Sequence, residues 1–131
     1  MPRLVKGAKW VFGWVTVGPD RRIAIPPDAW REYGFRAGEE AIFVPASRRS
    51  GGFGLSTPDL MARMVQKTDG VGPDPLARGR FGDGCVVLPA EIEVRPGQRL
   101  LAARGSGLAL GFVAQGLVYE EALGHPELVV W

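Results

Sequence analysis

The stretch "DRRIAIPPDAWREYGFRAGEEAIFV" (residues 20–44) decides the fold, because each of its parts predicts one element of structure. The apolar run 23–25 predicts a short strand that ends in proline, and residues 41–44 predict a second strand after a turn. Between them, Pro27 suits the first position of a short helix, and Gly34 can end that helix in a left-handed conformation. The stretch therefore predicts a strand–helix–turn–strand unit.

A second stretch, "DGCVVLPAEIEVRPGQRLLAA" (residues 83–103), has the same order of features. "IAIP" corresponds to "VVLP", and the turn "FRAGE" corresponds to "VRPGQ". A Ser-Gly hairpin signal and a short helix follow in each case. The chain thus divides into a first repeat (1–66), a linker (67–79) and a second, degenerate repeat (80–131). In the second repeat the stretch between the proline and the turn is shorter, so the helix expected there is reduced to about one turn.

Residues 9–17 open the first repeat as a strand, with Trp10, Phe12, Trp14 and Thr16 expected on one face. On the short helix, Trp30 and Tyr33 are expected to face the core, and Arg31 to face solvent. Four short strands cannot bury a core alone. We therefore expect a mainly β fold with short helices, in which residues 10–46 and 80–113 together close one small barrel.

Composition places the chain among soluble globular proteins, with 131 residues, 46% hydrophobic and 23% charged. No apolar run is long enough to span a membrane, and no signal peptide is recognisable. The lone Cys85 cannot form an internal disulfide, so a cytoplasmic location is expected. Residues 1–50 hold nine Lys/Arg against five Asp/Glu, whereas residues 51–131 hold seven against nine. This asymmetry indicates either a face for an anionic partner or an uneven solvated surface.

The order of a Gly/Asp turn, an arginine, "IxIP", a short helix and a second turn into a strand resembles the AbrB/MazE/SpoVT swapped-hairpin family. The resemblance covers residues 14–46 and, more weakly, residues 80–104. The tandem arrangement is similar to MraZ-type proteins. The resemblance implies a swapped-hairpin barrel that binds double-stranded DNA as a transcriptional regulator, with no cofactor.

The resemblance also implies which side chains contact DNA. Arg22, four residues before the proline of "IxIP", and Arg31, on the helix, correspond to basic positions of the family. Arg21 is their neighbour and Arg36 follows the helix, which completes the predicted DNA-binding set. Arginine suits this role because its planar fork binds a phosphate or a guanine edge with two hydrogen bonds. The alternative is that these arginines only keep a turn soluble.

The second repeat departs from this pattern, because Cys85 replaces the arginine and the helix arginine is missing. Three possibilities remain open: DNA binding by one side, a dimer that supplies two basic halves, or a barrel that has lost DNA binding. A dimer is expected to form through a surface outside the barrel, at the late helices or the apolar tail 127–131. That tail either completes a sheet edge in its own chain or pairs with another chain.

Enzymatic, metal and cofactor functions are not expected from the residues. His125 is the only histidine, and no spacing supplies it with the partners of a metal site or a catalytic triad. The glycines of residues 105–111 correspond to a hairpin turn in the first repeat, which argues against a phosphate-binding loop. The rival to DNA binding is an interaction module, including an antitoxin-like one, that uses the same barrel to bind a protein or a ligand.

Overall fold

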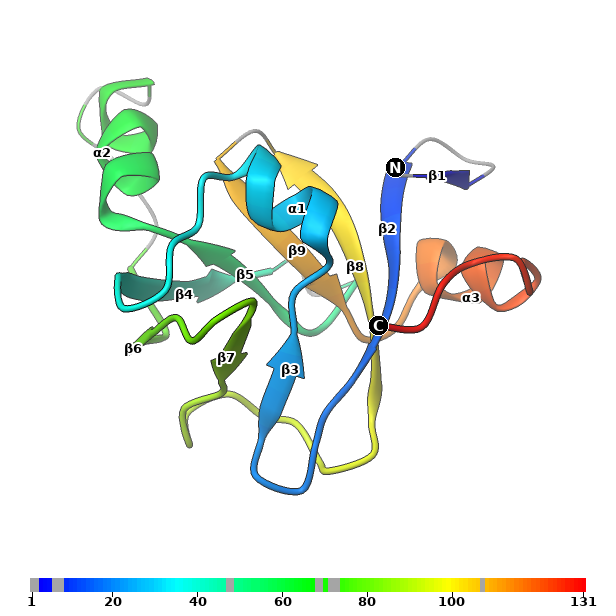
Figure 1. Cartoon of the computed structure of the whole chain (residues 1–131). Helices are drawn as coiled ribbons and strands as arrows, with labels where there is room; N and C mark the ends of the chain where they lie inside the picture. The colour runs from blue at the N-terminus through cyan, green and yellow to red at the C-terminus, as the bar shows by residue number, and fades with distance from the viewer. Residues whose placement is uncertain (1–2, 6–8, 47–48, 68–69, 71–73, 107) are drawn as a thin grey trace.

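The computed structural model describes residues 3–5, 9–46, 49–67, 70, 74–106 and 108–131, and it is mainly β with short helices (Figure 1). A seven-stranded antiparallel sheet has the order β1-β2-β8-β9-β5-β4-β6, and β3 and β7 form a separate two-stranded ribbon. The described elements, in chain order, are β1 (Arg3–Val5), β2 (Lys9–Thr16), β3 (Arg22–Ala24), α1 (Pro27–Glu32), β4 (Glu40–Pro45), β5 (Phe53–Ser56), α2 (Pro58–Lys67), β6 (Ala77–Arg80), β7 (Cys85–Val87), β8 (Arg99–Ser106), β9 (Ala109–Val113) and α3 (Leu117–Leu123).

Strands of the first half pair with strands of the second half. β2 pairs with β8, β4 pairs with β6, and β3 pairs with β7, all antiparallel. In the ribbon, Ile23 lies opposite Val86, and these are the corresponding residues of "IAIP" and "VVLP". Because each half supplies partners for the other, the two halves form one folding unit.

The same backbone hydrogen bonds occur at corresponding positions of the two halves. The Gly38 N–H donates to the carbonyl of Phe81 at 2.8 Å, and the Gly97 N–H donates to that of Val17 at 2.6 Å. The first bond joins the turn before β4 to the residue that follows β6. The second bond joins the turn before β8 to the residue that follows β2. The two ends of the ribbon are therefore held by equivalent contacts.

The described strands do not form the closed barrel that the sequence predicted. The sheet has two ends, β1 and β6, and no pairing joins them within the described residues. The physical reason is that β3 and β7 leave the sheet and pair with each other, so they add a second layer instead of closing a ring. A single bridge between Phe81 and Val86 links the ribbon to the sequence that follows β6.

A β-bulge in β2 changes the predicted face of that strand. The register with β8 shifts between Val11 and Gly13, which leaves Phe12 unpaired in the ladder. As a result, Phe12 joins the main core with Val15, whereas Trp14 joins a second core under α3. The prediction that Phe12 and Trp14 share one face is therefore wrong.

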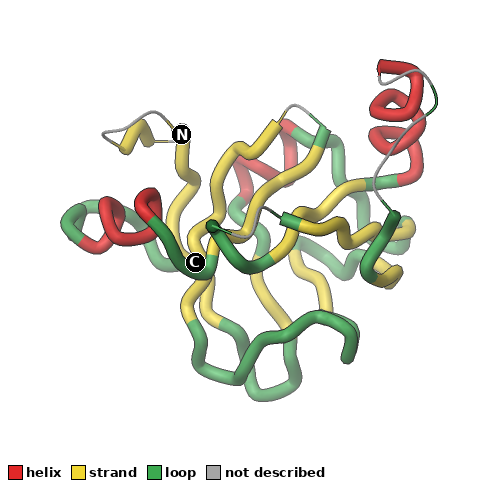
Figure 2. Tube along the Cα trace, turned by 180° about the vertical axis from the view of Figure 1, so that it is seen from behind, coloured by secondary structure: helices red, strands yellow, loops and turns green. Residues whose placement is uncertain are grey.

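The main core lies between the sheet and the layer formed by the ribbon and α1 (Figure 1). Tyr33 is buried in it and Trp30 is half-buried against it, as predicted, whereas Arg31 is exposed. Seen from behind, the sheet separates α2 from α3, which lie at opposite sides of the molecule (Figure 2). The second core packs α3 and the tail on β2, β8 and β9 through Val11, Trp14, Leu101, Ala103, Val113, Ala122 and Leu128.

The second half differs from the first between β7 and β8. No helix forms there, and a turn closed by the Ile92 N–H on the Pro89 carbonyl (3.0 Å) takes its place. β6 begins at Ala77, inside the segment expected to be the linker, because it pairs with β4. β6 therefore crosses the boundary between the predicted linker and the predicted second repeat.

The C-terminal tail pairs within its own chain, which decides between the two possibilities for residues 127–131. The Trp14 N–H donates to the carbonyl of Val129, and the Trp131 N–H donates to that of Trp14, both at 2.8 Å. Gly13 makes this possible at φ 128°, because a Cβ there would lie 2.5 Å from the Val129 oxygen.

Of the described helices, none is long and apolar enough to cross a membrane.

Candidate nucleic-acid interface

Arg21, one of the four predicted DNA-binding residues, is engaged inside the fold. Its guanidinium donates to four carbonyl oxygens of the turn that replaces the second helix. The Nη2 group lies 2.6 Å from the carbonyl oxygens of Pro89 and Ile92, Nε lies 3.0 Å from that of Leu88, and Nη1 lies 3.3 Å from that of Val94. These bonds occupy the fork that a phosphate would need, so we do not include Arg21 in the candidate interface.

The backbone of Arg21 is also unusual, because its φ of 64° lies in the left-handed region that glycine favours. The corresponding residue of the second half is Gly84, which has a φ of 71°. The turn conformation therefore does not explain why position 21 is an arginine, since glycine adopts it in the second half. Its side chain bonds to the turn that stands in the second half where the first half has α1. Arg21 therefore stabilises that turn.

Arg22 is exposed at the start of β3, opposite Val87 of β7. Its Nε lies 3.6 Å from the carboxylate of Asp20, and both side chains are more than half exposed. An exposed ion pair of this kind contributes at most about 1 kcal/mol, so a phosphate can exchange for the aspartate. The geometry thus leaves Arg22 available to an anion.

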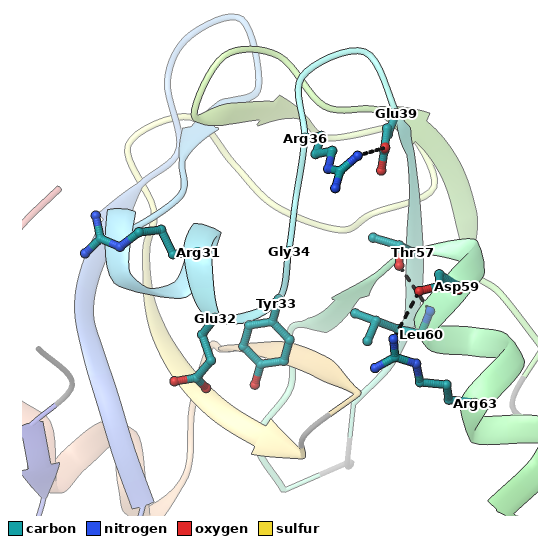
Figure 3. Close-up of a pocket in the computed structure, with 10 residues that line it drawn as sticks. All are labelled: Arg31, Glu32, Tyr33, Gly34, Arg36, Glu39, Thr57, Asp59, Leu60 and Arg63. Atoms are coloured by element: carbon teal, nitrogen blue, oxygen red, sulfur yellow. Dashed lines mark hydrogen bonds and ion pairs between the residues drawn. The ribbon is translucent and has the colours of Figure 1, made fainter.

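Arg31 and Arg36 are the most exposed of the predicted residues, with side chains 71% and 79% exposed. Arg31 bonds to Asp28 of its own helix, and Arg36 lies 4.0 Å from Glu39. Figure 3 shows Arg31 pointing away from the cleft in front of Tyr33, whereas Arg36 reaches toward Glu39 above it. The predicted residues therefore do not converge on one point; they are spread over the surface around α1.

The residues that the predictions missed belong to the second half. Arg95 is exposed in the turn before β8, in the position that Arg36 has in the turn before β4. The signal for Arg95 in the sequence is the correspondence of "FRAGE" with "VRPGQ", in which both turns carry an arginine at the second position. Arg80, at the end of β6, and Arg99, at the start of β8, are exposed beside these two turns.

The cleft in Figure 3 has a volume of about 500 Å³ and lies between the turn after α1 and the first turn of α2. Its walls carry side chains of both charges, which form ion pairs such as that between Arg63 and Asp59 at 3.3 Å. Burial raises the pKa of Tyr33 to about 12, with a further contribution from the neighbouring Glu32. Because its charges are paired, the cleft does not by itself select an anion or a cation.

Glu32 is held by Arg104 of β8 in a two-pronged ion pair, in which Nε lies 2.7 Å from Oε2. This hydrogen bond raises the pKa of the Arg104 guanidinium above its usual range. The pair fixes the end of α1 to the sheet. Arg104 is therefore a structural arginine and is not part of the candidate interface.

No cluster of metal-ligating side chains occurs among the described residues. His125 lies 3.1 Å from Glu127 and 3.9 Å from Glu121, near the end of the chain.

Comparisons of this chain with protein-family models, with curated proteins and with solved structures gave no match. The candidate interface thus depends on the geometry and charge of its own residues.

Proposed function

We propose that this chain is a DNA-binding transcriptional regulator of the AbrB-like, swapped-hairpin type, acting without a cofactor and without enzymatic activity. The alternate pairing of strands from the two halves is what such a tandem arrangement requires. The observation that carries the proposal is the equivalence of Arg36 and Arg95. Two exposed arginines lie on corresponding turns at the two ends of one ribbon.

The two ends of the ribbon give the proposed interface its shape. Figure 1 places the turn before β4 and the turn before β8 on opposite sides of the β3–β7 ribbon. Arg36 lies at the first of these ends. At the other end, the turn that carries Arg22 is bonded to the turn that carries Arg95, through Val17 and Gly97. Basic side chains at two separate places suit a DNA duplex, because its phosphates lie along two strands.

This arrangement favours one of the possibilities that the sequence left open. A single chain offers arginines at both ends of its ribbon, so contact with DNA does not require a second chain. The contact is asymmetric, because Cys85 replaces Arg22 and the second half has no counterpart of Arg31. We therefore propose that one chain binds along one face of the duplex, mainly through Arg22, Arg31, Arg36 and Arg95.

Fluorescence anisotropy with mixed-sequence labelled duplexes over a range of salt concentrations tests this proposal. If the four arginines contact phosphates, log K should fall with log salt at a slope of about −3 to −4, because each contact contributes roughly −0.9. Arg22→Ala should weaken binding. The matched control is Arg49→Ala, which removes an exposed arginine beside the loop before α3. Absence of binding to all duplexes at low salt would reject the proposal.

The second candidate function is binding of a protein partner, and the surface of α3 favours it. Leu117 is 84% exposed and Leu123 is 61% exposed, while Val129 and Val130 of the tail are about half exposed. Exposed apolar side chains on a helix and on the tail that follows it are a candidate interaction surface. The two functions are distinguished by the variants that impair them, since α3 carries none of the proposed DNA contacts.

A further inference from the structure

A second cavity, of about 400 Å³ and mostly apolar, lies beside α1 on the side of the C-terminus. Its walls come from distant parts of the chain: β3 and α1, the turn before β7, and the last residue. Two tryptophans, Trp30 and Trp131, line it, and Arg31 and Asp83 are its only lining residues with charged side chains within the described part of the chain. The volume is in the range of ordinary small-molecule sites.

Both tryptophans are held in place by the surrounding fold. Trp131 donates its indole N–H to the Phe12 carbonyl at 2.8 Å and its backbone N–H to that of Trp14. Trp30 packs edge-on against Phe35 and Phe81, with ring centroids 6.0 and 5.6 Å away. Because the rings are already ordered, a ligand that contacts them does not have to order them on binding.

The polar groups of the cavity favour a cation. Arg31 is bonded to Asp28, which offsets its charge. Asp83 is exposed, and no partner for its carboxylate occurs among the described residues. Backbone donors for an anion are few, because Pro27 has no N–H and the Ile25 N–H is bonded to the Gly84 carbonyl at 2.9 Å. The uncompensated side-chain charge of this site is therefore one carboxylate.

We propose that this cavity binds a small organic cation, such as an amidinium or alkylated ammonium group on a planar or apolar body. The indoles attract the cation through their π faces and bury its apolar body, while Asp83 pairs with its charge. This inference does not depend on DNA binding. It assigns to Trp30, Trp131 and Asp83 a role that the proposed interface does not use.

The test uses three isosteric probes on the full chain without DNA: benzamidine, which is cationic, benzamide, which is neutral, and benzoate, which is anionic. Isothermal calorimetry and the indole signals in NMR spectra report binding. We expect benzamidine to bind several-fold more tightly than benzamide, and benzoate to bind weakest. Tighter binding of benzoate would assign the site to Arg31 and overturn the proposal, as would no binding of benzamidine at about 10 mM.

Two variants locate the site. Asp83→Asn should lower the affinity for benzamidine about fivefold and leave that for benzamide unchanged, because only the charged probe loses a partner. Asp74→Asn, which alters another exposed aspartate, is the matched control. Trp131→Leu should weaken both probes by about threefold, since it removes one π face from either. Benzamidine binding that is insensitive to both variants would place it elsewhere and reject the proposal.

Discussion

The guanidinium of Arg21 lies 2.6 Å from the carbonyl oxygen of Ile92, a residue 71 positions further along the chain. Together with its bonds to Leu88, Pro89 and Val94, this contact ties the first half to the shortened turn of the second. Arg21, which was included in the predicted DNA-binding set as the neighbour of the motif arginine, thus stabilises the fold internally. Its neighbour Arg22 remains exposed, and the two differ in function although they are adjacent in sequence.

Replacing Arg21 should therefore impair folding. We expect Arg21→Ala to lower the free energy of unfolding by about 2–4 kcal/mol in urea titrations, because four carbonyls lose a charged donor and alanine is strained at a positive φ. Arg21→Gly should recover about 1 kcal/mol of this loss by relieving the backbone. Arg22→Ala is the control, with a change below about 0.5 kcal/mol. Equal stability of the two alanine variants would contradict the structural role of Arg21.

Arg36 and Arg95 should make similar contributions to DNA affinity. Each single alanine variant is expected to reduce the steepness of the salt dependence by about 0.9, and the double variant by about twice that, because the two turns lie apart. Anisotropy titrations on one mixed-sequence duplex measure this. Unfolding curves of the variants should overlay that of the parent chain. A loss confined to Arg36 would mean that only the first half contacts DNA.

Gly13→Ala should release the tail. A methyl group at this position would lie 2.5 Å from the Val129 oxygen, and the φ of 128° disfavours any side chain. We expect a destabilisation of at least about 2 kcal/mol, measured by thermal unfolding. Truncation after Gly124 should lose the same tail contacts. If the tail is the cause, adding Gly13→Ala to the truncated chain should then cost less than in the full chain.

Tyr33 should make stability fall at high pH. Its pKa is about 12 in the folded chain, compared with about 10 in an unfolded one, so the folded state retains the proton while the unfolded state loses it. The free energy of unfolding should therefore decrease between pH 10 and 12 by about 1.4 kcal/mol per pH unit. Absorbance titration of the tyrosines gives the pKa directly. Tyr33→Phe should flatten this part of the stability profile, and an unchanged slope would contradict the assignment.

The exposed leucines of α3 are the side chains through which we expect a dimer to form. Leu117→Ser together with Leu123→Ser should shift the mass found by light scattering toward that of a monomer, because these side chains would lie in the interface. Since both are largely exposed, each change should alter stability by less than about 0.5 kcal/mol. DNA affinity at low protein concentration should be unchanged. A dimer that persists with both serines would place the interface elsewhere or leave the tail as its main element.

Much of the local structure could be predicted from the sequence. The strand at Ile23, α1 after Pro26 and the left-handed Gly34 follow from short-range preferences that are expressed in neighbouring residues. The correspondence of "IAIP" with "VVLP" also marks two strands that pair with each other in the structure, with Ile23 opposite Val86. Such patterns are readable because strand period, proline geometry and turn chemistry act within a few residues.

The sequence by itself determined that the chain is written as two related halves with short strands, short helices and a basic first half. The tertiary structure decided which arginines are exposed, where β2 bulges and that the described strands form no closed barrel. It also placed Trp131 and Trp30 at the same cavity, which local patterns could not reveal. The physical reason is that these features depend on groups tens of residues apart, such as Arg21 and the carbonyls near Ile92, which meet only once the chain has folded.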